Sequence, residues 1–110
     1  MLFEQLEKSA EEIQFKEVIT FIDEHYDFTP TKFTNGNLVN EADQNNGSCK
    51  VFSFAKLNDL SKEETLSLFG AFYREDVLQN PEGTDHQNIR NFMNFGWDGI
   101  SFDGKPLVRK

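Results

Sequence analysis

Cysteine is nearly absent from this 110-residue chain, in which Cys49 stands alone. A single thiol cannot form an internal disulfide, and this suits a reducing compartment. The only histidines are His25 and His86, and the sequence has neither a His-Glu-x-x-His motif nor a pair of closely spaced cysteines. It also has no glycine-rich loop of the kind that cradles phosphates. We therefore expect no metal site and no cofactor.

Basic residues are also scarce, with 11 Lys and Arg against 19 Asp and Glu, which gives a formal net charge of −8. Nucleic acids and anionic membranes are polyanions whose binding needs clustered positive charge, so we expect neither as a partner. No apolar run is long enough to cross a membrane, and no signal peptide is recognisable. The expected protein is a cytoplasmic monomer whose unknown partner is another protein or a small molecule.

The length and the hydrophobic content of 37% fit a single domain that covers residues 1–110. Three patterns of Ser or Thr followed three residues later by Glu or Gln begin at Ser9, Ser61 and Thr84. Such capping boxes are typical of the first turn of a helix. Together with apolar residues at helical spacing, they predict helices near residues 15–27, 61–77 and 85–95.

The remaining segments are harder to assign. Residues 2–8 are compatible with a further short helix. Residues 31–48 are rich in Asn, and a short hairpin is expected around Asn35-Gly36, within a loop that is either functional or mobile. Residues 49–57 alternate like a strand but also keep helical spacing, and Ser48 as an N-cap favours the helix.

The tail alternates Ile100 and Phe102 and has Asp103-Gly104 as a tight turn, so we expect a closing hairpin there. The predicted fold class is therefore α+β and mostly helical. We expect about four to five helices, with short β-hairpins in the Asn-rich loop and at the C-terminus.

The stretch 84–97 carries the densest set of side chains able to recognise a ligand. A histidine in the first turn of a helix is pushed toward neutrality by the positive helix end, so His86 is suited to accept a hydrogen bond or act as a base. Asn-Gly turns let backbone amides approach a ligand closely. The alternative is structural, with His86 capping a neighbouring element and the Asn residues bracing turns. Besides His86, the candidate binding residues are Asn35, Gly36, Asn45, Gly47, Ser48, Lys50, Asn88, Arg90 and Trp97.

Thiol chemistry is a second hypothesis for the same residues. Cys49, His86 and Asp85 supply a nucleophile, a base and an orienting carboxylate, and Asp76 is another choice for the carboxylate. A cysteine at the start of a helix would have its thiolate stabilised by the positive helix end. The alternative is that Cys49 is a small buried apolar residue. The residues leave open whether the protein is an enzyme.

Asp76 interrupts the apolar face of the helix expected over 61–77, close to its negative end. A lone buried carboxylate is unfavourable there, so Asp76 needs a cation, Arg90 or His86, unless it is solvated. We take an ion pair between Asp76 and Arg90 as the hypothesis to test.

Several runs in the chain resemble the HopJ family of type III effector proteins. They include Gly47-Ser48-Cys49-Lys50, Pro81-Glu82-Gly83 and the long run from Asp85 to Met93, and the similarity covers nearly the whole chain. The resemblance implies a bacterial protein and, as an alternative location, secretion by a type III system into a host cell. It implies no established reaction. We therefore expect an interaction or ligand-binding protein with a polar site around His86, and a small thiol-dependent hydrolase or amide-transforming enzyme as the alternative.

Overall fold

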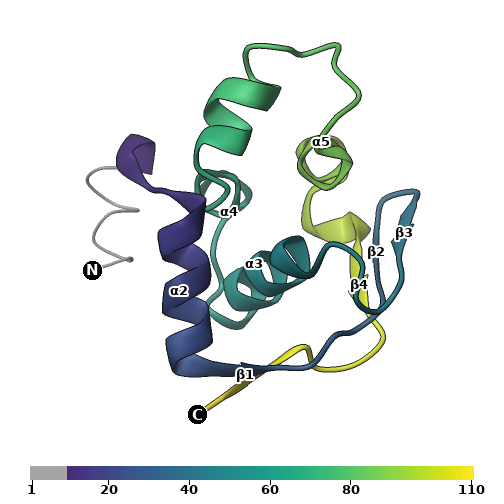
Figure 1. Cartoon of the computed structure of the whole chain (residues 1–110). Coiled ribbons are helices and arrows are strands. Elements are labelled where there is room, and N and C mark those ends of the chain that lie inside the picture. The colour runs from purple at the N-terminus through teal and green to yellow at the C-terminus, as the bar shows by residue number, and fades with distance from the viewer. Residues whose placement is uncertain (1–9) are drawn as a thin grey trace.

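The computed structural model describes residues 10–110 (Figure 1). A short 3-10 turn, η1 (Ala10–Glu12), leads into helix α2 (Phe15–His25), which buries Val18 and Ile22 and exposes its charged face. The helix ends two residues before the predicted 27, because strand β1 (Tyr26–Phe28) begins at once. The helix proposed for residues 2–8 and the capping box beginning at Ser9 lie outside the described residues.

Helix α3 (Asn46–Leu57) lies at the centre of the molecule, between α2 and the strands (Figure 1). The helix predicted over 49–57 is confirmed, but the N-cap role expected of Ser48 is wrong, because the helix begins at Asn46 with Asn45 as its N-cap. Its apolar side chains from Val51 to Ala55 are fully buried. A helix that is buried on most sides is apolar nearly all round. This explains why the same residues also alternate like a strand in the sequence.

The prediction of one helix over 61–77 is wrong, because the segment forms two separate helices. The capping box of Ser61 and Glu64 is confirmed at the start of α4 (Lys62–Ser67), with both of its hydrogen bonds present. The chain then breaks at Gly70, whose φ is +61°, and continues as the π-helix η2 (Phe72–Val77). A Cβ at Gly70 would lie 2.8 Å from the backbone nitrogen of Phe15. The break therefore depends on a segment distant in sequence.

Helix α5 (Gln87–Phe95) is followed by the 3-10 turn η3 (Gly96–Gly99). The helix predicted over 85–95 is confirmed apart from its first two residues. The capping box expected from Thr84 and Gln87 is wrong, because His86 is the N-cap and has left-handed dihedrals. The Gln87 amide instead donates to the carbonyl oxygen of Thr84, at 2.6 Å.

Within residues 10–110, five short strands complete an α+β fold. Strands β2 (Phe33–Asn35) and β3 (Leu38–Asn40) form the predicted hairpin, and β4 (Ile100–Phe102) pairs with the other edge of β2. Strand β5 (Leu107–Arg109) pairs with β1.

The hairpin predicted at the C-terminus is wrong, because β4 and β5 do not pair with each other. Residues 26–35 and 100–109 instead run antiparallel in one continuous register, from Tyr26 opposite Arg109 to Asn35 opposite Ile100. Pro30 and Pro106 lie in the gap between the two paired stretches, where proline removes a ladder donor.

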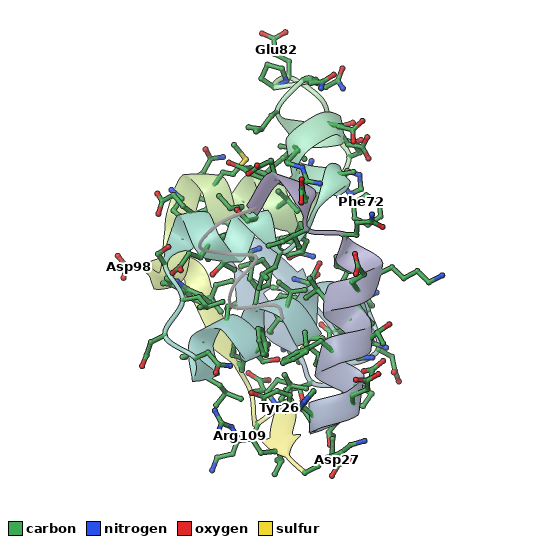
Figure 2. All side chains as sticks on the ribbon, turned by 90° about the vertical axis from the view of Figure 1, so that its left-hand side faces the viewer. Tyr26, Asp27, Phe72, Glu82, Asp98 and Arg109 are labelled. Carbon is green, nitrogen blue, oxygen red and sulfur yellow. The ribbon has the colours of Figure 1, made fainter. Side chains whose placement is uncertain are left out.

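The core is built mainly from phenylalanine rings, and Figure 2 shows side chains filling the space between the helices. Phe52 lies at its centre, with its ring 4.9 Å from that of Phe92 and 5.4 Å from that of Phe69. Among the described helices, none is long and apolar enough to cross a membrane.

Candidate functional site

A pocket of about 490 Å³ lies where the first turns of α3 and α5 meet. Both helices begin at a residue in the left-handed region, Asn45 with φ 54° and His86 with φ 48°, and neither side chain caps its own helix. The first backbone N–H groups of a helix have no acceptor within it. First-turn residues of both helices line the pocket, namely Gly47, Ser48, Gln87 and Asn88.

The opposite wall of the pocket is aromatic. Phe15 stacks on Phe69 with ring centroids 6.0 Å apart, and Phe72 meets the Phe15 ring edge-on at 5.2 Å. Phe72 remains 40% exposed, although it is a large apolar side chain. A Cβ at Gly47 would lie 2.9 Å from the tip of the Phe15 ring, so glycine is what allows this ring to lie against the start of α3.

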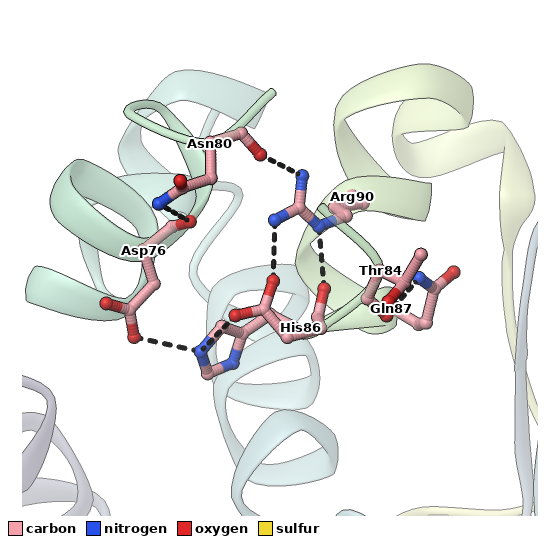
Figure 3. A network of polar contacts seen from close by, with 7 residues as sticks. Asp76, Asn80, Thr84, His86, Gln87 and Arg90 are labelled. Atoms are coloured by element: carbon pink, nitrogen blue, oxygen red, sulfur yellow. Dashed lines mark hydrogen bonds and ion pairs between the residues drawn. The ribbon is translucent and has the colours of Figure 1, made fainter. Parts of the chain in front are cut away.

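His86 contacts two carboxylates and one aromatic ring, and Figure 3 shows its contact with Asp76. Its Nε2 lies 3.0 Å from Oδ2 of Asp76 and 3.9 Å from Oδ2 of Asp85. Its ring lies 5.1 Å from that of Phe72. Because Asp76 is an acceptor, this contact favours the tautomer with the proton on Nε2. His86 is therefore the partner of Asp76, one of the two that the sequence offered.

The expected pair of Asp76 and Arg90 is wrong. The Arg90 guanidinium donates instead to Oδ1 and to the backbone oxygen of Asp85, both at 2.6 Å, and to the carbonyl oxygen of Asn80 at 2.8 Å (Figure 3). The hydrogen bond from Arg90 lowers the pKa of the Asp85 carboxyl below its usual value. Arg90 thus stabilises the turn that precedes α5, because it donates to Asn80 at the start of the turn and to Asp85 at its end.

A cluster of four asparagines lies beside the pocket, and two of them, Asn45 and Asn88, also line it. Asn88 Nδ2 donates to Oδ1 of Asn40 at 2.9 Å, and Asn40 Nδ2 donates back to Oδ1 of Asn88 at 3.1 Å. Asn35 Nδ2 donates to the backbone oxygen of Asn88 at 2.8 Å, and Asn45 Nδ2 donates to Oδ1 of Asn40 at 2.7 Å. The cluster joins the β2–β3 hairpin to the starts of both helices. Asn40 was missed by sequence reasoning, which treated the Asn-rich loop as turns.

Cys49 faces the core and does not line the pocket. The side chain is 1% exposed, and its Sγ lies 3.7 Å from the carbonyl oxygen of Thr31. Burial raises the pKa of the Cys49 thiol to about 11. The expectation that the helix end activates this thiol is wrong, because burial raises its pKa, and Cys49 does not line the pocket that His86 and Asn45 share. These surroundings give the thiol-enzyme hypothesis no support.

Three other candidates have structural contacts outside the pocket. Lys50 Nζ lies 2.8 Å from Oδ1 of Asp23, and Trp97 Nε1 donates to the carbonyl oxygen of Leu60 at 3.1 Å. Gly36 has φ +63° and lies directly under the Phe95 ring. Within residues 10–110, no group of three or more His, Cys, Asp and Glu side chains is arranged to hold a metal ion.

The comparisons with known proteins agree with the resemblance noted in the sequence. The chain is similar to a protein whose solved structure is titled "Crystal structure of unknown function protein VPA0580", with 56% identity and a TM-score of 0.96. The match covers 98% of this chain and 90% of the other. The search of curated proteins found no match. The model of the HopJ type III effector protein family matches residues 1–107, and the chain therefore belongs to that family.

Proposed function

We propose that this protein binds a small anionic ligand with an apolar or aromatic body in the pocket between α3 and α5. The observation that carries the proposal is the convergence of two helix N-termini on one pocket with an aromatic opposite wall. Helix N-termini present free amides and a positive dipole end, which together favour carboxylate or phosphate groups. The pocket volume is also within the range of small-molecule sites.

Each side of the pocket has a distinct role in this proposal. The anionic group lies at the first-turn amides of Gly47 and Ser48 on one helix and of Gln87 and Asn88 on the other. The apolar body lies against the ring of Phe72, which is otherwise left partly exposed. The imidazole of His86 adds a polar group at the rim, and Asp76 fixes its orientation.

The net charge of the chain determines how an anion could be attracted to this pocket. With a formal net charge of −8, the surface as a whole repels anions. An anion that binds here therefore depends on local positive potential from the helix ends rather than on general attraction. Ligands of equal shape but different charge test this directly.

The experiment is a titration of the isotope-labelled protein with 3-phenylpropionate, followed by amide NMR spectra. We expect shifts at the first turns of α3 and α5, and much weaker effects from the neutral 3-phenylpropanamide.

Gly47→Ala should reduce binding, because its Cβ would displace the Phe15 ring. His86→Ala should weaken binding without a large loss of stability. His25→Ala is the control, since His25 lies outside this pocket and is hydrogen-bonded to Phe21. Shifts spread over the whole surface, or equal binding of the amide, would reject the proposal.

We also propose that the protein works as a monomer in the cytoplasm of the cell that makes it. The lone Cys49, which is buried and reduced, supports this location. The family description raises the alternative of export by a type III system. Fractionation of the producing cells and their medium, with and without a working type III system, separates the two.

A further inference from the structure

The second large hollow of the molecule shares no lining residue with the pocket at His86. This groove has a volume of about 760 Å³ and lies between the second half of α3 and the strand segments β4 and β5. From these observations we propose that the groove binds an extended, acidic segment of another protein, which adds as a strand to the free edge of residues 100–109.

The first observation is the free edge itself. In the part of the chain that the structure describes, β4 is the last strand of its sheet, and β5 has only β1 beside it. Both pair on the same side, because residues 100–109 follow residues 26–35 in one register. Each of the two strands therefore has a second edge with unpaired backbone groups, which is what strand addition uses, and residues 103–106 interrupt this edge.

The hydrogen bonds show which backbone groups point outward from β4. Antiparallel strands turn alternate residues toward the partner. Gly36 N donates to Gly99 O at 2.9 Å, and Asp103 N donates to Lys32 O at 3.0 Å. Residues 99 and 103 thus face inward, so Phe102 between them directs its backbone groups to the groove side.

The same reasoning applies to β5. Thr29 N donates to Pro106 O at 2.8 Å, and Lys110 N donates to His25 O at 3.1 Å. Residues 106 and 110 thus face β1. By alternation, Leu107 and Arg109 direct their backbone groups to the groove side. The alternation changes phase between residues 103 and 106, so a regular added strand would find donors and acceptors along one segment at a time.

The second observation is the charge of the groove. Among the residues that the structure describes, the charged ones that line the groove are all basic, namely Lys56, Lys105 and Arg109. This contrasts with the formal net charge of −8 for the chain. Lys56 Nζ lies 5.7 Å from the centre of the Phe102 ring, which keeps the ammonium group at the groove wall. Charge complementarity therefore selects an acidic partner.

The third observation is apolar surface along the same groove. Leu57 is 51% exposed and Val108 is 56% exposed, although both are aliphatic. An extended peptide places alternate side chains on opposite faces. A segment that alternates acidic and aliphatic residues would therefore cover Leu57 and Val108 with one face and reach the basic residues with the other.

The test uses the full chain and a labelled peptide, acetyl-Glu-Val-Asp-Val-Glu-Val-Asp-amide, with fluorescence anisotropy as the readout. We expect saturable binding, and amide NMR shifts that concentrate in residues 100–109. The peptide with Lys in place of each acid should not bind. The double variant Lys56→Glu with Arg109→Glu should weaken binding by roughly tenfold or more. Lys16→Glu, an exposed change on α2 away from the groove, is the matched control.

Two N-methylated peptides separate strand addition from simple charge attraction. One carries methyl groups on alternate backbone nitrogens, and the other carries them on the intervening nitrogens. Strand addition predicts that one pattern abolishes binding and the other preserves it, because only alternate amides face the edge. Equal binding of both, or shifts outside the groove, would overturn the proposal. Phosphatidylserine vesicles or duplex DNA that bind through Lys56 and Arg109 while the peptide does not would overturn it as well.

Discussion

Asn40 and Asn88 exchange a pair of side-chain amide hydrogen bonds across 48 positions of sequence, at 2.9 and 3.1 Å. Both side chains are nearly inaccessible to solvent. The pair ties the β2–β3 hairpin to the first turn of α5, which is also one wall of the pocket. The geometry of the pocket therefore depends on this amide cluster, two of whose members, Asn45 and Asn88, also line the pocket.

Removal of Asn88 should destabilise the protein strongly. Asn88→Ala removes the acceptor of the buried Asn40 amide and one of the two acceptors of the Asn35 amide, and a stranded buried group costs about 1–3 kcal/mol. We expect a loss of roughly 2–5 kcal/mol in the free energy of unfolding by urea. Asn94→Ala is the control, because Asn94 is exposed on the same helix. An Asn88→Ala variant as stable as this control would show that water replaces the cluster.

Gly70 should not tolerate a side chain. Its φ of +61° strains any other residue, and a Cβ would lie 2.8 Å from Phe15 N and 3.0 Å from Ile13 O. Since these are backbone atoms, Gly70→Ala should cost on the order of 2–4 kcal/mol. Gly104→Ala is the matched control, since a Cβ there would meet only Thr31 Cγ2 at 3.8 Å. Equal thermal midpoints for the two variants would contradict this account.

Arg90→Ala should loosen the turn before α5. The variant removes the bonds to Asn80 and to the backbone of Asp85, so we expect a loss of about 1–2 kcal/mol. It should also raise the Asp85 pKa toward 3.8, because the hydrogen bond from Arg90 lowers it in the native protein. A carboxyl titration by NMR measures this.

The Asp85 shift also fixes the sign of a pH effect. A lowered pKa in the folded protein contributes stability above the unfolded pKa of 3.8, and this contribution is lost as the pH falls below it. The difference in stability between the wild type and Arg90→Ala should therefore shrink under acidic conditions. If this difference in stability stayed constant from neutral to acidic pH, Arg90 would not lower the pKa of Asp85.

Cys49 should be unreactive in the folded protein. A pKa raised from 9.0 to about 11 lowers the thiolate fraction at neutral pH by about a hundredfold, and burial blocks access. Labelling by a thiol reagent should therefore follow the rate of unfolding. Rapid labelling under native conditions, with the fold intact, would revive the idea of a reactive thiol.

The same shift predicts alkaline sensitivity. The raised pKa of Cys49 contributes stability that is fully present below about 9 and is lost as the pH rises from there through about 11. Tyrosine and lysine also titrate in this range, so the comparison is with Cys49→Ala. The advantage of the wild type over Cys49→Ala should decrease above pH 9, as measured by urea unfolding at each pH.

Local sequence signals predicted the elements whose causes are local. The capping box of Ser61 and Glu64 and the helical spacing in residues 15–27 depend only on neighbours within a few positions. The break at Gly70 needs the backbone of Ile13 and Phe15, and no local pattern contains that information. The separation of β4 from β5 likewise depends on a register with residues 26–35.

The site was predicted in part for the same reason. His86, Asn45 and Asn88 were candidates because their residue types are suited to recognition, and the structure brings them to one pocket. Which acid His86 contacts and which acid Arg90 contacts depend on how η2 and α5 approach each other. Cys49 and Trp97 have chemically capable side chains, but their positions in the fold direct them to structural contacts.

The register between residues 26–35 and 100–109 also affects the order in which parts of the fold form. Tyr26 lies opposite Arg109, so this ladder closes a loop of most of the chain. Such closure is entropically costly and is slow unless the intervening helices have already condensed. The groove beside α3, which β4 and β5 line, therefore forms only when this ladder has closed.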